Sequence, residues 1–179
     1  MLRALALLLV ILLAGRALAA DTARVEAARL RFAVPTTWTR LPAGEAEAAR
    51  YRLPPAEGDM GESILVLRAP SGEDVMATDE QLERWYARFT QPDGRPTKAV
   101  AAVLKRTVDG LRVTRADVSG TYVGSTGGSI QAGVSGYRLL GAVIEGEGGP
   151  WLFVALGPNA TIGGVRADFD ALLLSLELH

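Results

Sequence analysis

The sequence has 179 residues, of which 19 are basic and 20 are acidic, and a formal net charge of −1. This balance does not favour nucleic acid or an anionic membrane as a partner, because both attract a basic surface. The chain has no cysteine and one histidine, His179, at its last position. These counts exclude a disulfide framework, a cysteine nucleophile and zinc sites built from cysteine and histidine.

Residues 1–19 have the pattern of a secretory signal peptide. Arg3 supplies the positive start, residues 4–15 are an apolar run, and Ala17-Leu18-Ala19 is typical of a cleavage site. Arg16 ends the run before it reaches the length of a transmembrane helix, although an uncleaved anchor is the alternative. We therefore expect an exported protein, periplasmic or extracellular, whose residues 20–179 form one globular domain without a stable membrane anchor. The arginine-rich, lysine-poor composition points to a bacterium.

The first half of the domain predicts three strands followed by a helix. Residues 29–35 alternate apolar and polar side chains, 48–54 are a second candidate, and 63–69 are an almost continuous apolar run. A helix is expected over residues 78–90, because apolar side chains recur there at helical spacing and Thr78 with Gln81 resembles a capping box.

The second half predicts two hairpins and a final helix. Residues 98–108 and 111–124 flank Asp109-Gly110, a strong two-residue turn signal. Residues 137–146 and 150–157 flank a second glycine-rich turn, and 161–177 carry an apolar stripe at helical spacing. The order β-β-β-α-β-β-β-β-α predicts an α+β fold with a mostly antiparallel sheet of about six to seven strands.

The motifs that carry chemistry are few. A catalytic triad needs an oriented histidine inside a site, which a terminal His179 does not supply, so we expect no catalytic residue, no cofactor and no enzymatic activity. The segment 124–129, GSTGGS, lacks the lysine of a phosphate-binding loop and is better interpreted as a flexible connection. It remains a candidate contact surface.

One acidic loop is a weak calcium candidate. Glu57, Asp59 and Glu62 lie in the glycine-punctuated loop 54–62, and calcium binds several such oxygens. The spacing lacks the order of an EF-hand, so a solvated acidic loop is the simpler interpretation and no metal is expected. Trp38 lies beside a turn, and both a core role and a ligand-binding role stay open for it.

Several segments of the sequence resemble one protein family. The segments are FAVPTTW (32–38), the hairpin around VDGL (108–111), a helix with Arg84, Trp85 and Phe89, and PWLFVALGP (150–158) leading into a final helix. Together they are similar to the PsbP-like family, which includes an extrinsic subunit of photosystem II, a Ran-binding import factor and many secreted bacterial proteins of unknown role. The resemblance implies a three-layer α/β/α sandwich with a helix on each face, and a non-enzymatic binding or assembly role.

Three functions follow as hypotheses. The first is an exported binding domain, expected to be a monomer, for an unknown protein or envelope component. The second is a small-molecule or lipid carrier with a cleft between sheet and helix, and the third is a carboxylate- or metal-dependent hydrolase. The residues proposed for ligand or partner contact are Trp38, Arg88, Arg95, Ser125, Gly127, Gly128 and Gln131.

Overall fold

In a computed structural model of the chain, residues 20–70, 76–124 and 133–179 are described, so the predicted signal peptide lies outside the described residues. The described parts form two antiparallel sheets and three α-helices, in agreement with the predicted α+β class. A three-stranded sheet has the order β1 (Thr22–Ala27), β2 (Leu30–Pro35) and β11 (Glu177–Leu178).

The larger sheet has eight strands. Its order is β3 (Thr39–Leu41), β4 (Ala49–Arg52), β5 (Ile64–Arg68), β10 (Trp151–Pro158), β9 (Val134–Glu145), β8 (Leu111–Tyr122) and β6 (Phe89–Thr90). The eighth strand, β7 (Ala102–Val108), pairs with the first part of β8, whereas β6 pairs with its last part.

The prediction of one sheet with six or seven strands was wrong in two respects. Residues 29–35 do form β2, but β2 belongs to the second sheet. The strands that were not predicted are either very short, as in β3, β6 and β11, or mostly exposed, as in β1. Neither kind carries the alternation of buried and exposed side chains by which a strand is recognised.

Both predicted hairpins are confirmed. Asp109 and Gly110 adopt positive φ angles of 46° and 77°, as a tight hairpin turn requires, and Val108 pairs with Leu111 across it. In the second hairpin Ile144 on β9 pairs with Trp151 on β10. The intervening residues 146–150 include the predicted glycine turn.

Helix α1 (Thr78–Tyr86) begins where it was predicted but ends four residues earlier. Phe89 and Thr90 form β6 instead, pairing with Tyr122 and Thr121 of β8. Phe89 is still buried beside α1. Its spacing from Leu82, Trp85 and Tyr86 therefore indicated correctly that it is buried, but not that it is helical. The predicted capping box was also wrong, because the N-cap residue is Ala77 and not Thr78, and no capping hydrogen bond from a side chain is found among the described residues.

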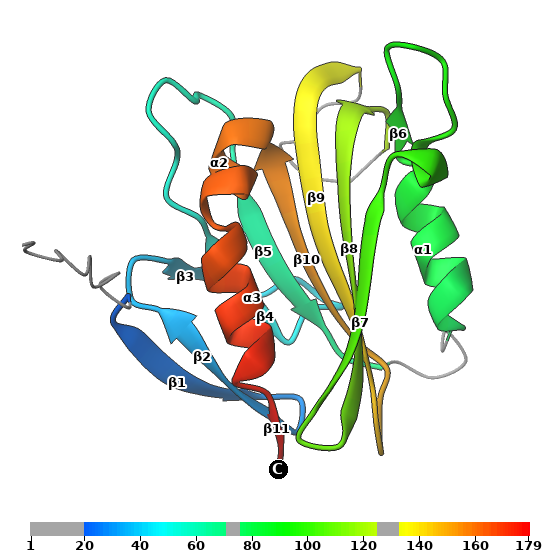
Figure 1. Cartoon of the computed structure of the whole chain (residues 1–179). Coiled ribbons are helices and arrows are strands. Elements are labelled where there is room, and N and C mark those ends of the chain that lie inside the picture. Colours follow the sequence, from blue (N-terminus) through cyan, green and yellow to red (C-terminus); the bar gives the residue numbers. More distant parts are fainter. Residues whose placement is uncertain (1–19, 71–75, 125–132) are drawn as a thin grey trace, which may run out of the picture.

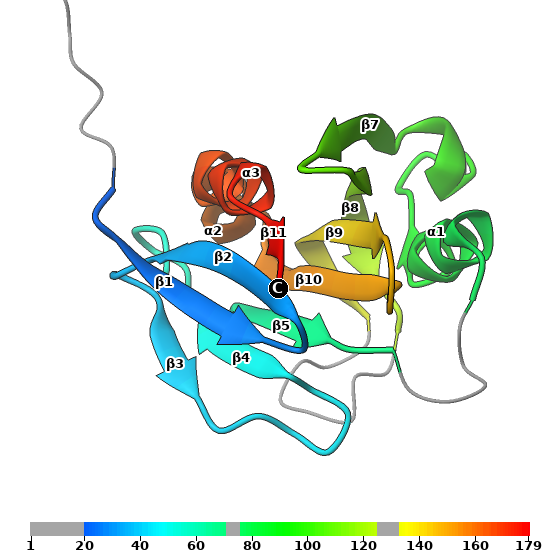
Figure 2. The ribbon, with the colours of Figure 1, turned by 90° about the horizontal axis from the view of Figure 1, so that it is seen from below.

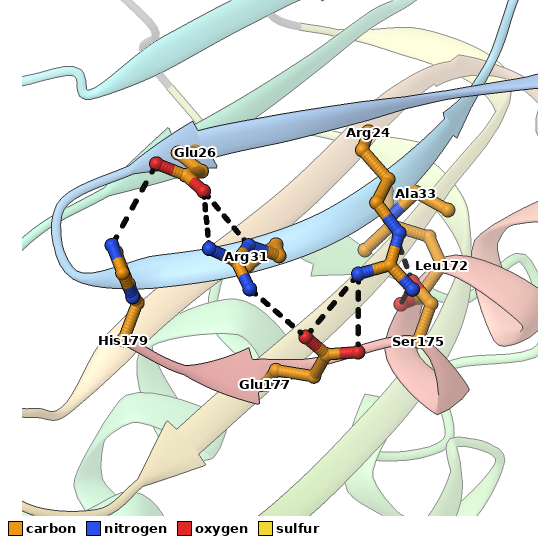
Figure 3. Close-up of polar contacts among 8 residues, drawn as sticks. All are labelled: Arg24, Glu26, Arg31, Ala33, Leu172, Ser175, Glu177 and His179. Carbon is orange, nitrogen blue, oxygen red and sulfur yellow. Dashed lines mark hydrogen bonds and ion pairs between the residues drawn. The ribbon is translucent and has the colours of Figure 1, made fainter.

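The single predicted helix over 161–177 is in fact two helices and a strand. Helix α2 (Asn159–Gly164) ends at a pair of glycines, which are poor helix formers, and α3 (Arg166–Leu174) follows. At the end of α3 the Ser175 hydroxyl donates to the Leu172 carbonyl (2.7 Å) and accepts from the Ala33 amide (2.8 Å), as Figure 3 shows. This contact joins the helix end to β2, and the chain continues as β11 along that strand.

The apolar core has two clusters that meet opposite faces of β9. Leu140, Ala142 and Ile144 pack with α2, α3 and the three-stranded sheet. Leu139 and Val143, which alternate with them, pack with α1. Figure 1 shows α3 and α1 on either side of the strands β9 and β8, and Figure 2 shows the three-stranded sheet beside α3. The three-stranded sheet therefore packs on the same face of the larger sheet as α3, and this second sheet was not predicted.

Candidate functional site

Trp38, the first proposed contact residue, lies in the core. Its side chain is only 5% exposed and packs in the cluster with α3. Its indole Nε1 is buried without a hydrogen-bond partner among the described residues. The structure therefore places Trp38 inside the domain and not on the wall of an open cleft.

Arg88 and Arg95 lie at the two ends of a short segment that includes β6. The Arg88 carbonyl accepts from the Val123 amide at the end of β8 (2.8 Å). Burial raises the pKa of the Tyr122 hydroxyl, and the nearby charge of Arg88 offsets part of that rise. Arg95 is exposed, and its Nε donates to Asp93 in the same turn at 2.7 Å. The remaining proposed contact residues, Ser125, Gly127, Gly128 and Gln131, lie outside the described residues.

The acidic loop 54–62 has a structural role through Asp59. Its Oδ2 accepts from both the amide (3.0 Å) and the hydroxyl (2.6 Å) of Thr161, so the carboxylate caps the start of α2. Glu57 is exposed. Across residues 20–70, 76–124 and 133–179, no group of three or more histidine, cysteine, aspartate or glutamate side chains is placed to hold a metal ion. Glu57, Asp59 and Glu62 are therefore not gathered into such a group.

A set of charged residues that was not singled out from the sequence meets on the α3 side of the larger sheet. Arg115 and Asp117 come from β8, Arg138 comes from β9, and Arg166 and Asp170 come from α3. We call these five residues the arginine–aspartate cluster. It joins two strands to the helix that covers them.

Asp117 is the centre of the cluster. Arg138 binds it through two parallel hydrogen bonds, Nε to Oδ1 and Nη2 to Oδ2, both 2.7 Å long. The Asp117 Oδ2 atom also lies 3.5 Å from Arg115 Nη1 and 3.7 Å from Arg166 Nε. Arg115 Nε lies 3.1 Å from Asp170 Oδ1. The hydrogen bonds to Asp117 raise the pKa of Arg138.

The cluster is largely removed from solvent. The side chains of Arg115 and Asp117 are 5% and 8% exposed. They follow Leu111 and Val113 at every second position of β8, and these two apolar residues pack in the core on the same side. The sequence signal for this site was a charged pair at positions where β8 continues an inward-facing row. That signal indicates two buried charges on β8 but not their partners on β9 and α3.

The edge strand β7 borders the same region. Leu104 pairs with Arg115 and Ala102 pairs with Asp117, so these β7 residues lie on the same face as the cluster. In the part of the chain that the structure describes, no strand pairs with the outer edge of β7. Val100, Val103 and Leu104 are exposed. The backbone edge and these apolar side chains together form a surface that we call the β7 edge.

Two adjoining hollows lie on the other face, at the start of α1. Their volumes are 470 and 530 Å³, and both are lined by Ala77, Thr78, Arg112 and Glu145. Arg112 Nη2 donates to Glu145 Oε1 at 3.0 Å, and this hydrogen bond is the main cause of the lowered pKa of Glu145. Lys105 of β7 lines the second hollow. The two opposite charges that line both hollows, Arg112 and Glu145, already pair with each other.

Comparisons with known proteins identify the fold. No known family model matches the sequence, and no curated protein matches it. A solved structure of cyanobacterial PsbP from Synechocystis superposes with a TM-score of 0.53 at 14% identity, covering 92% of this chain and 96% of that one. The chain has a PsbP-like fold. The resemblance read from the sequence is thereby confirmed for the fold.

A second solved structure, a protein of unknown function from Pseudomonas aeruginosa, matches with a TM-score of 0.49 at 11% identity. It covers 88% of this chain and 97% of that chain. The PsbP-like fold carries no activity by itself, since one fold supports unrelated functions. Within the described ranges, no helix is long and apolar enough to cross a membrane.

Proposed function

We propose that the protein is an exported, non-catalytic binding domain that engages a protein partner of the cell envelope by adding an extended segment of that partner to the β7 edge. The observation that carries this proposal is the open seven-residue strand with exposed apolar side chains on both of its faces. An unpaired strand edge is a template for another extended chain. Export is inferred from residues 1–19 of the sequence.

The apolar surface is concentrated at this strand. The structure has six exposed large apolar side chains among its described residues, and three of them, Val100, Val103 and Leu104, lie within five positions. Val103 and Leu104 are consecutive on a strand, so they point to opposite faces. A partner strand at this edge would therefore find an apolar contact on each side of the new backbone ladder.

The charges on β7 favour a partner over a second copy of the chain. Lys105 is the central residue of β7, and Arg106 follows it. Full-length antiparallel pairing of two copies would place Lys105 opposite Lys105, and like charges directly opposite each other destabilise a pair of strands. A segment with acidic side chains would avoid that repulsion. We accordingly infer a monomer that binds an acidic, extended segment.

The same proposal includes the arrangement of the layers and a non-catalytic role. We infer a three-layer α/β/α sandwich in which the three-stranded sheet extends the layer of α2 and α3. The position of His179, the one histidine, supports a non-catalytic role. Its amide donates to the Arg29 carbonyl (2.8 Å), and its Nε2 lies 3.9 Å from Glu26 on the surface of the smaller sheet. Nothing in the described residues favours the carrier or hydrolase alternatives over binding.

The test uses one pair of matched variants. Val103→Asp adds a charge to the β7 edge, and Met60→Asp adds the same charge at an exposed apolar residue in the loop 54–62. After cross-linking in the envelope identifies a partner, binding of that purified partner is measured for each variant. We expect Val103→Asp to weaken binding more than about tenfold, or about 1.4 kcal/mol, and Met60→Asp to leave it unchanged.

Circular dichroism of both variants checks that each is folded. Equal binding by the two variants would overturn the proposal, and so would a concentration-dependent dimer in which Lys105→Glu alters the association. The first result would remove the β7 edge as the site, and the second would make another copy of this chain its occupant.

A further inference from the structure

The arginine–aspartate cluster holds more positive than negative charge. Three guanidinium groups, from Arg115, Arg138 and Arg166, face two carboxylates, from Asp117 and Asp170. Each guanidinium has five N–H donors, whereas each carboxylate accepts about four hydrogen bonds. The cluster thus has an excess charge of +1 and donors that its own carboxylates do not satisfy.

Arg115 shows where the unsatisfied donors lie. Its side chain is almost fully buried, yet its Nε and Nη1 atoms have no hydrogen-bond partner among the described residues. Asp170 Oδ1 is close enough to Nε for an ion pair at 3.1 Å, but the two groups are not aligned as a hydrogen bond. A buried charge with unmet donors is unfavourable unless a further acceptor is supplied.

The cluster is accessible from one side. Arg166 is 47% exposed, and Arg138 is partly exposed. Leu104 of β7, which pairs with Arg115 of β8, is exposed on the same face of the sheet. An incoming anion would meet Arg166, the most exposed of the three arginines, before the buried Arg115.

We propose that the arginine–aspartate cluster is a binding site for an oxyanion, either a phosphate group or a carboxylate. Planar guanidinium groups match both by forming paired N–H···O bonds. Arg166 and Arg115 are the residues that bind the anion, whereas Arg138 remains bound to Asp117. The site does not depend on docking at the β7 edge, because it uses side chains of β8, β9 and α3.

The first experiment measures anion binding to the protein comprising residues 20–179. Inorganic phosphate and acetate are titrated separately at constant ionic strength maintained with sodium chloride, while the arginine Nε–Hε signals are followed by nuclear magnetic resonance. We expect saturable shifts of the Arg115 and Arg166 signals. Saturation by phosphate alone identifies a phosphate-bearing ligand, and saturation by both anions identifies a site that also takes a carboxylate. Absence of saturable shifts with both anions would overturn the proposal.

The second experiment compares three variants. Arg166→Gln removes the exposed guanidinium of the cluster and should weaken binding by about tenfold, or about 1.4 kcal/mol. Arg112→Gln, which removes an exposed arginine of the same strand β8 outside the cluster, should leave binding unchanged. Asp117→Asn removes the internal carboxylate that competes with the anion, so the folded variant should bind more tightly than the wild type. A purely structural ion-pair network predicts neither the loss in Arg166→Gln nor the gain in Asp117→Asn. Equal losses in Arg166→Gln and Arg112→Gln would show a general effect of surface charge and would reject the site.

Discussion

Gly141 on β9 lies directly against the indole ring of Trp85 from α1. A methyl group at this position would be 2.5 Å from Trp85 Cζ3 and 2.6 Å from its Cη2 atom. Trp85 is 1% exposed and cannot turn away without disturbing the cluster around α1. The absence of a side chain at Gly141 is therefore what allows the helix to approach the sheet.

We predict that Gly141→Ala destabilises the protein by about 1 to 3 kcal/mol, the usual cost of overpacking a core. The free energy of unfolding, measured by urea denaturation, checks this expectation. Gly164→Ala is the matched control, since nothing lies within 4 Å of a methyl group there and the residue is helical. That variant should be unchanged or more stable by up to about 1 kcal/mol. A Gly141→Ala protein as stable as the control would show that α1 is free to shift.

At the scale of elements, β11 is held to the smaller sheet by a chain of ion pairs. Arg31 on β2 binds Glu26 of β1 and lies 3.6 Å from Glu177 of β11, and Arg24 lies 3.3 Å from Glu177, as Figure 3 shows. The hydrogen bond from Arg31, followed by its charge, lowers the pKa of the Glu26 carboxyl. Protonation of Glu26 therefore weakens an attachment between β1 and β2.

The sign of the resulting pH dependence follows from the direction of this shift. A carboxyl with a lowered pKa in the folded state adds stability above its ordinary pKa, and that contribution is lost as the pH falls through the lowered value. We predict that Glu26→Gln reduces stability at neutral pH and makes its decline shallower between about pH 5 and about pH 3. Urea unfolding across this range measures both effects.

Glu80→Gln serves as the control for this prediction, because Glu80 is an exposed glutamate on α1, far along the chain from the smaller sheet. Asp93 and Glu145 also have lowered pKa values, so some acid sensitivity should remain in the Glu26 variant. If the Glu26 and Glu80 variants had identical pH profiles, the ion pair with Arg31 would make no contribution to stability.

At the scale of the whole molecule, the strands β8, β9 and β10 connect the two core clusters. Consecutive residues of β9 enter opposite clusters, as Leu139 and Leu140 illustrate. Because the same strands supply side chains to both clusters, a loss of packing in one cluster disturbs the strands that the other cluster packs on. We therefore expect the two clusters to unfold together, as in a single cooperative domain.

Tryptophan fluorescence can test this cooperativity, because Trp85 lies in one cluster and Trp38 with Trp151 lies in the other. The variant Trp85→Phe reports on the cluster with α3, and the double variant Trp38→Phe/Trp151→Phe reports on the cluster with α1. In each variant, the fluorescence midpoint in urea should coincide with the midpoint from circular dichroism. Separate midpoints in either variant would reveal that one cluster unfolds first.

The sequence by itself determined the fold class, the two hairpins and the start of α1. These features depend on local signals, namely period-two alternation, the Asp109-Gly110 turn and the helical spacing of Leu82, Trp85 and Tyr86. It also determined the resemblance to the PsbP-like family, which the structural comparison confirmed for the fold.

Only the tertiary structure decided the ends of the helices, the second sheet and the arginine–aspartate cluster. Phe89 became part of a strand because β8 offered it a partner, and Ser175 ended α3 because Ala33 of β2 lay within hydrogen-bonding distance. Asp117 and Asp170 are 53 positions apart, and it is Arg115 that brings them into one site. Such outcomes depend on contacts between segments distant in the chain, and local periodicity contains no information about which of those segments will meet.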